Sequence, residues 1–389
     1  MPEMPTIIVE LVLIYVGTSL LATLFLFLKQ PIILSYILLG MLIGPNGLQW
    51  IANADRVAQI SQFGIILLLF LIGLNLHPTQ LYTLFRKAVI ITLGTCLIFA
   101  LATTLITYHF GFPWVDSIIV GMALMFSSTV ISLKLIPTSD LHHARIGEVM
   151  LSILLLQDIL AILVIAIVGT YSTQSLPLFI PGLFLKLTVL TGVALALARY
   201  GLLWLFKQFS TIQEYIFVVS LGWCLCLAEA AHRLELSYEI GAFIAGVSLA
   251  ISPIALVIAE HLKSLREFFL ILFFFAVGAQ FDVSITQQVL LPGMTLGLLL
   301  LALKPMIFTY AFRLSGENPA VSQELAVRLG QASEFALLIS YTALANQLVS
   351  QLTAYLIQAI VVFSFIVSTY WVVWRYATPI ASNARQRRD

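Results

Sequence analysis

The feature that most constrains this chain is a series of apolar runs, each about 20 residues long, such as Leu11–Leu28 and Ile153–Val168. A helix of that length crosses the hydrocarbon core of a bilayer, which is about 30 Å thick. Barrel strands would instead be about 10 residues long with strict alternation. Since lipid offers no partners for backbone polar groups, the runs predict an all-α polytopic membrane protein.

Composition agrees with this prediction and excludes several functions. The chain is 61% hydrophobic and 10% charged, whereas soluble domains carry about 25% charged residues. The net charge of +1 and the lack of a large basic patch exclude a nucleic-acid partner. No Walker-type phosphate loop and no Ser-His-Asp or HExxH pattern is present. We therefore expect neither an enzyme nor an ATP-driven pump, and no cofactor.

Breaks at proline, glycine and charged residues divide the chain into about 13 spans. We expect a single transmembrane domain over residues 1–389, without a cytoplasmic regulatory domain. The first apolar run lacks a basic n-region and a cleavage site, so it is interpreted as a true span. The predicted spans are 6–28, 32–50, 57–75, 87–108, 115–136, 147–170, 178–206, 212–232, 238–257, 264–281, 289–313, 322–346 and 351–376.

The distribution of Lys and Arg predicts the orientation, because these residues gather in cytoplasmic connections. The connections on the opposite side contain only Arg56 and Arg233. The asymmetry places the C-terminus in the cytoplasm and, with an odd number of spans, the N-terminus outside, in a cell inner (plasma) membrane. The connections assigned to the cytoplasm contain Lys29, Arg86, Lys87, Arg145, Lys207, Lys263, Arg266, Arg313 and Arg328, and the C-terminal end adds Arg375, Arg385, Arg387 and Arg388.

Two spans have interrupted, polar centres. Span 115–136 contains Phe-Ser-Ser-Thr at 126–129, and span 322–346 contains Gly-Gln-Ala-Ser-Glu at 330–334. Each is the middle member of a three-span set, 87–170 and 289–376. Paired interrupted helices in corresponding positions indicate the binding site of a secondary transporter built from an inverted repeat.

Asp158 is the sharpest candidate for that site. It lies in the middle of a span, where a charged residue is costly and usually functional. Burial disfavours the charged form of a carboxyl group, which suits exchange of a proton for a metal cation. The alternative is an Asp held in a structural hydrogen-bond network. Neighbouring Gln157 offers an amide oxygen that either coordinates a cation or hydrogen-bonds the site.

Ser127, Ser128 and Thr129 offer hydroxyl and backbone oxygens in the first interrupted span. Alkali cations are hard ions that take oxygen ligands, and an unwound stretch exposes carbonyl oxygens. We therefore predict that these residues bind a cation. The alternative is that their hydroxyls bond to the carbonyl four residues earlier, which is common in membrane helices.

The basic and acidic partners of the site are predicted in the last spans. Lys304 lies mid-span beside Pro305, and it either pairs with Asp158 or Glu334 or caps broken-helix carbonyls. Glu334, which follows Gln331 and Ser333, either neutralises a helix N-terminus, binds the ion or pairs with Lys304. Elsewhere, Glu229 is predicted as a solvated carboxylate at a helix end, and Lys134 reaches towards the interface.

Five stretches in register resemble the membrane domain of the monovalent cation:proton antiporter-2 family, especially its Kef-type potassium efflux members. The resemblance covers nearly all of residues 10–375. The stretches are FSSTVISL, LLLQDILAI, SYEIGAFIAGVSLA, FFLILFFFAVGAQFD and RLGQASEFALLI, and LIGPNGL and LLLFLIGLNL near the N-terminus also fit.

The resemblance implies a fold of 13 helices in an inverted repeat, with two crossed broken helices in the fifth and twelfth spans. It implies a homodimer in which a core slides against a dimerisation scaffold, with the core in spans 87–170 and 289–376. The resemblance implies that Asp158 is the carboxylate to which the cation and the proton bind in turn. Gln157, Lys304 and Glu334 match family positions. The family usually has Gln at the position of Lys134, and small or apolar residues at those of Tyr238 and Glu239.

Together these features predict a secondary transporter that exchanges potassium or sodium for protons, with one monovalent cation bound at Asp158. The Gln157–Asp158 pair favours potassium. Two alternatives stay open: a cation channel or gated potassium efflux pathway without obligatory proton coupling, and a sensor in which the ion only sets the conformation.

Overall fold

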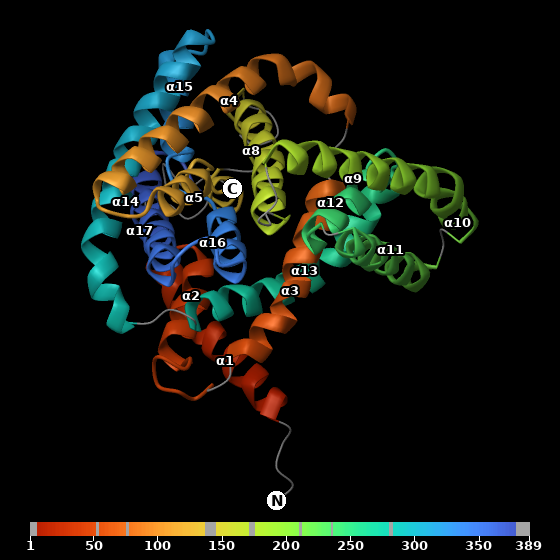
Figure 1. The fold of residues 1–389 in the computed structure, drawn as a ribbon, viewed down its shortest axis with the longest axis horizontal. Helices are drawn as coiled ribbons and strands as arrows, with labels where there is room; N and C mark the ends of the chain where they lie inside the picture. The colour runs from red at the N-terminus through yellow and green to blue at the C-terminus, as the bar shows by residue number, and fades with distance from the viewer. Residues whose placement is uncertain are drawn as a thin grey trace, which may run out of the picture. The chain divides into compact units, whose positions relative to one another are not determined.

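The computed structural model describes residues 6–51, 54–74, 78–136, 145–170, 176–209, 212–234, 236–279 and 283–378, and these form helices joined by short connections (Figure 1). The elements are α1 (Thr6–Phe27), α2 (Ile32–Ile43), α3 (Ala54–Leu74), α4 (Pro78–His109), α5 (Trp114–Leu124), α6 (Thr129–Lys134), α8 (Arg145–Thr170), α9 (Leu176–Leu197), η1 (Ala198–Leu202), α10 (Leu203–Gln208), α11 (Gln213–Arg233), α12 (Tyr238–Leu249), α13 (Ile254–Ala279), α14 (Val283–Leu314), α15 (Pro319–Arg328), α16 (Phe335–Ala345) and α17 (Gln351–Arg375).

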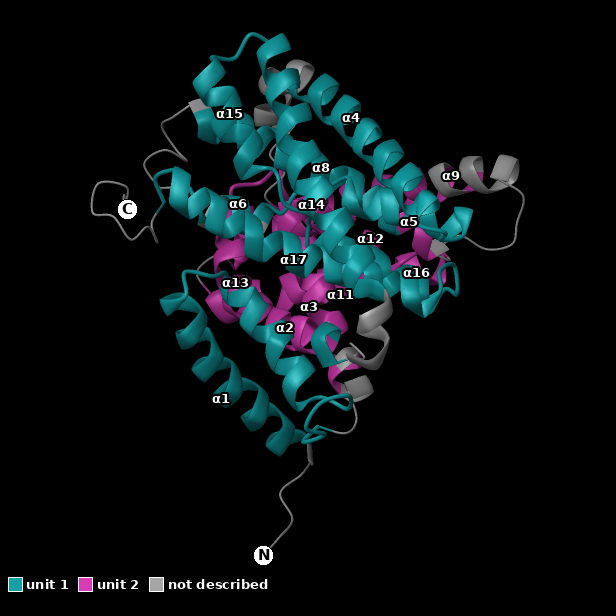
Figure 2. Ribbon diagram, turned by 90° about the vertical axis from the view of Figure 1, so that its left-hand side faces the viewer, with its two compact units in different colours: residues 1–54, 84–165, 277–389 teal, residues 55–83, 166–276 magenta. Residues whose placement is uncertain are grey.

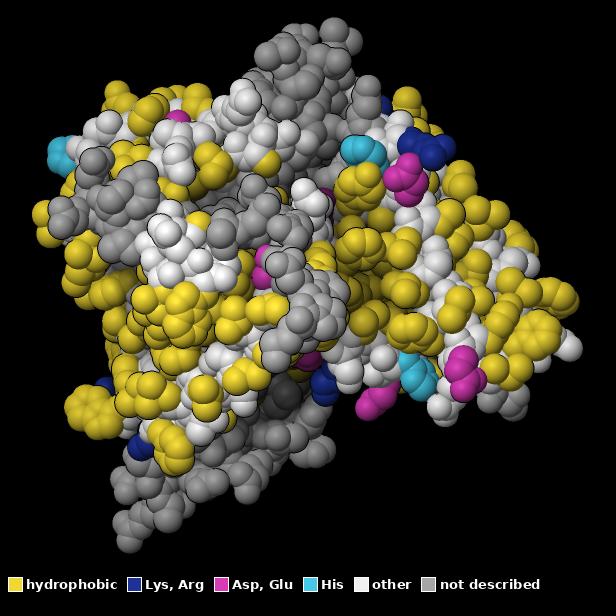
Figure 3. Space-filling model, turned by 90° about the horizontal axis from the view of Figure 1, so that it is seen from below, with side chains coloured by type: hydrophobic (Ala, Val, Ile, Leu, Met, Phe, Trp, Pro, Cys, Tyr) yellow, Lys and Arg dark blue, Asp and Glu magenta, His cyan; other side chains and the backbone are white. Residues whose placement is uncertain are grey.

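Helix length and surface composition confirm the predicted membrane class. In the described part of the chain, seven helices are long and apolar enough to cross a membrane, and five shorter helices are also apolar. The predicted spans fall on helices, with 178–206 covering α9, η1 and most of α10 and 238–257 crossing from α12 into α13. Figure 3 shows a face on which hydrophobic side chains predominate and charged ones are few. Such a surface suits lipid, because soluble monomers rarely expose large apolar patches.

The chain forms two compact units (Figure 2). The first contains residues 1–54, 84–165 and 277–389, and the second contains residues 55–83 and 166–276. Within the first unit α14 packs against α15 and α17, and α16 packs against α5 and α17. Within the second unit α12 packs against α9 and α11. The assignment of core and scaffold spans stays a prediction.

The predicted boundary between the ninth and tenth spans is wrong. The prediction placed the connection at 258–263, whereas the structure ends α12 at Leu249 and starts α13 at Ile254. Polar residues such as Glu260 and Lys263 suggested a loop, but they lie on the exposed face of α13, beside buried Leu262. The actual break coincides with Ser252 and Pro253, since proline cannot donate the backbone hydrogen bond that continues a helix.

Aromatic packing holds α14 in the first unit. The rings of Phe99 on α4 and Phe308 on α14 meet edge to face with centroids 5.1 Å apart, and Phe308 stacks on Phe312 at 5.7 Å. Buried residues of α8, among them Ile153 and Leu154, complete this cluster. The packing brings α4, α8 and α14 together in the first unit.

A glycine brings the first interrupted helix against α4. A Cβ atom on Gly121 of α5 would lie 2.1 Å from Thr104 Oγ1 and 2.5 Å from the Ala100 carbonyl oxygen. Small residues commonly permit such close approach between membrane helices. Any larger side chain at 121 would force α5 away from α4.

Candidate functional site

Both predicted interruptions are present, and each divides a span into two half-helices. The first lies between α5, which ends at Leu124, and α6, which begins at Thr129. The second lies between α15, which ends at Arg328, and α16, which begins at Phe335. Each interruption frees backbone carbonyl and N–H groups that a continuous helix would pair.

Hydrogen bonds connect the two breaks directly. Ser127 Oγ donates to the Leu329 carbonyl oxygen at 2.7 Å, and Ser132 Oγ donates to the Arg328 carbonyl oxygen at 3.0 Å. Gln331 Nε2 donates to Ser132 Oγ at 2.8 Å. Segments about two hundred residues apart in sequence thus satisfy each other's polar groups.

Asp158 lies beside the first break. Its side chain, on α8, is 3% exposed, and its Oδ1 accepts a hydrogen bond of 2.9 Å from Thr129 Oγ1. The Glu334 carboxyl group is close enough for its charge to act on Asp158. The structure therefore brings together Asp158, Thr129 and Glu334, three of the predicted site residues.

Gln157 supports the break. Its Oε1 accepts a hydrogen bond of 2.9 Å from the Ser127 backbone N–H, and its side chain is fully buried. Of the two predicted alternatives, these contacts match the hydrogen-bonding one. A peptide N–H released by the break thereby gains a partner, without which its burial would cost about 1–3 kcal/mol.

Lys304 joins the two breaks. Its Nζ donates to the Phe126 carbonyl oxygen and, at 3.1 Å, to the Gln331 carbonyl oxygen. The ammonium also lies 5.5 Å from the centre of the Phe99 ring. The predicted capping of broken-helix carbonyls is therefore the alternative that these contacts match. A cation is favourable there, because half-helices direct partial negative charge from their C-terminal ends.

Pro305 and Gly330 allow Lys304 to approach the second break. A Cβ atom added to Gly330 would lie 3.0 Å from Pro305 Cγ, so glycine permits this contact. Pro305 lies inside α14 without ending the helix.

The hydroxyls of Ser128 and Ser333 cap half-helices. Ser128 Oγ accepts from the Ile131 N–H at 3.1 Å, at the start of α6. Ser333 Oγ accepts from the Phe335 N–H at 3.1 Å, at the start of α16. Glu334 occupies the N-cap position of α16, where negative charge is favourable. For Ser127 and Ser128, the contacts differ from the alternative considered above, in which each hydroxyl bonds to the carbonyl four residues earlier.

Several polar residues of this region were missed by the sequence analysis. Ser368 Oγ donates to Gln331 Oε1 at 3.1 Å, and Ser364 Oγ accepts from the Ala332 N–H at 3.1 Å. Their spacing of four residues puts both hydroxyls on one helical face, which was the available signal. Asp116 was also missed; its Oδ2 accepts from the N–H and hydroxyl of Ser350 and from Thr353 Oγ1.

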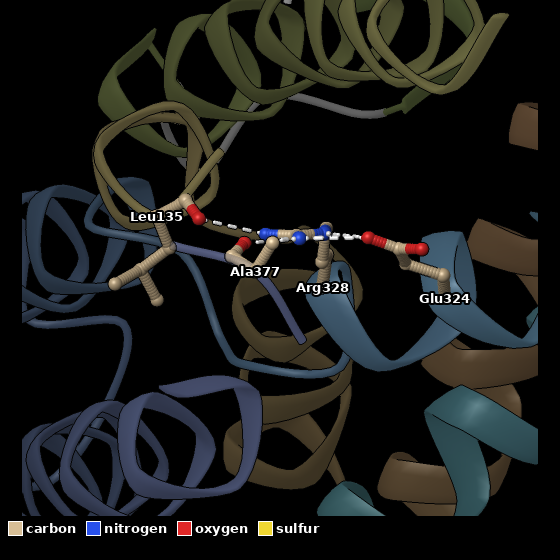
Figure 4. Close-up of polar contacts among 4 residues, drawn as sticks. All are labelled: Leu135, Glu324, Arg328 and Ala377. Carbon is tan, nitrogen blue, oxygen red and sulfur yellow. Dashed lines mark hydrogen bonds and ion pairs between the residues drawn. The ribbon is translucent and has the colours of Figure 1, made fainter. Parts of the chain in front are cut away.

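The sequence analysis assigned Arg328 to a connection, whereas in the structure it is the last residue of α15 and its side chain is buried. Its side chain is 1% exposed and bonds Leu135, Ala377 and Glu324 (Figure 4). Burial is possible because these partners satisfy the guanidinium group. Glu229 was predicted correctly: it is exposed and pairs with Arg233 at 2.8 Å. The side chains of Arg56, Arg86, Lys87, Arg145 and Lys134 lie outside the described residues, and so does everything beyond residue 378.

Comparison with known proteins adds three similarities. Residues 14–375 match a family described as the transmembrane sodium/hydrogen exchanger. The chain is 27% identical to the iron transporter MagA of Paramagnetospirillum magneticum, over 89% of this chain and 80% of that protein. It is 28% identical to K(+) efflux antiporter 6 of Arabidopsis thaliana, over 86% of this chain but only 57% of the plant protein.

A solved structure confirms the type of fold. The sodium proton antiporter MjNhaP1 of Methanocaldococcus jannaschii superposes with a TM-score of 0.70, covering 94% of this chain and 96% of that one. The sequence identity is 18%, so this likeness concerns the fold.

Proposed function

The chain belongs to the sodium/hydrogen exchanger family, which makes it a secondary transporter and not an enzyme, and on this premise we propose that it exchanges a potassium ion for protons at Asp158. The observation that carries the proposal is the buried Asp158 carboxyl group beside the broken helices. A carboxylate held out of water binds either a proton or a cation, since either one neutralises its charge.

Coupling follows from exclusive occupancy of this one group. A cation that binds Asp158 displaces the proton, and a proton that binds displaces the cation. Only the neutralised site crosses the membrane at low cost, because an uncompensated charge in lipid is unfavourable. Alternating access then requires the core spans to move against the scaffold spans, within a homodimer in the cell membrane.

The oxygen-rich surroundings favour a hard monovalent cation. Thr129 Oγ1 is in contact with Asp158, and the hydroxyls of Ser127 and Ser128 lie in the same break. Hard cations take oxygen ligands. The Gln157–Asp158 pair and the similarity to K(+) efflux antiporter 6 support potassium ahead of sodium.

The proposal is tested by proton movement in proteoliposomes with a pH-sensitive dye and a clamped membrane potential. We expect proton flux on adding potassium, and a weaker response to sodium. Iron is added in a separate measurement, because the similar protein of Paramagnetospirillum magneticum is named as an iron transporter. A response to sodium alone would contradict the choice of ion. Cation flux without proton flux would identify a channel, and no flux of any ion would identify a sensor.

A further inference from the structure

Arg328 lies at a junction of three segments of the first unit. Nη1 donates to the Leu135 carbonyl oxygen at 2.7 Å, and Nη2 donates to the Ala377 carbonyl oxygen at 2.9 Å. Nε and Nη2 both donate to Glu324 Oε1, at 3.0 and 2.7 Å. Figure 4 shows the guanidinium group between Leu135 on one side and Glu324 on the other. The group therefore joins the ends of α6, α15 and α17.

Leu135 is the C-cap of α6, and α6 is only six residues long. A helix of this length has few internal hydrogen bonds and little stability of its own. Its position therefore depends on contacts made from outside. At its start Thr129 bonds Asp158, and at its end Leu135 bonds Arg328.

Arg328 holds α6 at a second point through its backbone. Its carbonyl oxygen accepts from Ser132 Oγ at 3.0 Å, one turn before Leu135. The side chain and the main chain of one residue thus fix the second half of α6. Because only six residues separate the two ends of α6, displacing its C-terminal end displaces its first residue, Thr129, relative to Asp158 on α8.

The chemistry of the junction requires arginine. A guanidinium group directs several donors in one plane, whereas an ammonium group is a compact charge on a flexible stem. Lysine at 328 can donate a hydrogen bond to the Leu135 carbonyl oxygen, but it cannot also donate to Glu324 and to the Ala377 carbonyl oxygen in the same geometry. The Glu324 side chain is 23% exposed and balances the buried charge.

We infer that Arg328 is a positioning residue for the exchange reaction, which sets the place of α6 and thereby the hydrogen bond between Thr129 and Asp158. It acts on the cation site without contacting it. The inference rests on the proposed function, because its effect is measured as cation affinity during exchange.

The test compares Arg328→Gln and Arg328→Lys with wild type and with Arg313→Gln. Arg313 is a matched control, since it lies in the last turn of α14 and is exposed. Two quantities are measured on folded protein: the potassium concentration that gives half-maximal proton flux, and hydrogen exchange of the amides at 129–136. Thermal unfolding in detergent shows whether each variant folds.

For Arg328→Gln we expect faster amide exchange over 129–136 and a half-saturating potassium concentration raised about tenfold, which corresponds to about 1.4 kcal/mol. For Arg328→Lys we expect a smaller rise in the half-saturating potassium concentration than for Arg328→Gln, and for Arg313→Gln we expect the wild-type value. A folded Arg328→Gln protein with wild-type half-saturation would overturn the inference, even if its thermal stability fell. If Arg328→Gln does not fold, Glu324→Gln replaces it, with the same two expectations. Absence of exchange in wild type would instead refute the proposed function.

Discussion

Thr129 Oγ1 and Asp158 Oδ1 lie 2.9 Å apart, joined by a hydrogen bond from the first residue of α6 to the middle of α8. Thr129 is the N-terminal residue of the half-helix that follows the first break. The contact therefore connects the backbone interruption to the buried carboxyl group. A change of charge at Asp158 is felt directly at the start of α6.

Replacing Thr129 by Val removes this hydroxyl while keeping the shape of the side chain. The bond stabilises the charged form of Asp158, and hydrogen bonds to charged groups contribute about 1.5–3 kcal/mol. We expect the pH at which the exchange rate is half-maximal to rise. We also expect the half-saturating potassium concentration to rise. Thr129→Ser, which keeps the hydroxyl, is the control. A pH profile of Thr129→Val that coincides with that of Thr129→Ser would show that the bond is irrelevant.

Replacing Lys304 by Met leaves the Phe126 and Gln331 carbonyl oxygens without their shared donor. Each such buried acceptor costs about 1–3 kcal/mol. We expect a lower thermal unfolding temperature in detergent and loss of exchange. Met306→Leu, on the exposed side of the same helix, controls for an apolar substitution in α14. Unchanged stability of Lys304→Met would contradict the capping role.

Replacing Gln157 by Leu leaves the Ser127 N–H without its acceptor. The two side chains are similar in size, so the main loss is one buried hydrogen bond of the break. We expect destabilisation of about 1–3 kcal/mol and faster amide exchange at 125–129. If the amides at 125–129 were as well protected from hydrogen exchange as in wild type, the break would be held in place without Gln157.

Asp116 caps the start of α17, far along the chain from its own helix. Its Oδ2 accepts from the Ser350 N–H at 3.0 Å and from Thr353 Oγ1 at 2.6 Å. Loss of a capping side chain costs about 0.5–2 kcal/mol. Asp116→Ala is therefore expected to lower the unfolding temperature and to leave the half-saturating potassium concentration within about twofold of wild type. An altered potassium affinity at full stability would place Asp116 in the ion pathway instead.

The sequence was sufficient to predict the helical membrane fold and the two interrupted spans. Long apolar runs admit few folds in lipid. The polar residues within 127–129 and 331–334 mark positions where a continuous helix is unfavourable. The intramembrane charges Asp158 and Lys304 were found for the same energetic reason.

Contacts between segments that lie far apart in the sequence could not be predicted from the sequence alone. Ser127 could bond locally or across the fold, and only the packed structure shows that its hydroxyl bonds the Leu329 carbonyl oxygen. Arg328 was assigned to a cytoplasmic connection from the distribution of Lys and Arg along the chain. Its burial depends on the Leu135 and Ala377 carbonyl oxygens, which no local pattern places beside it.

The most direct test of the account is proton flux driven by a potassium gradient in proteoliposomes that contain wild type or Asp158→Asn protein in equal amounts. The substitution keeps the shape of the side chain and removes its charge and its titration. The account predicts potassium-dependent proton flux with wild type and none above the empty-liposome background with Asp158→Asn. Full exchange by a folded Asp158→Asn protein would contradict it.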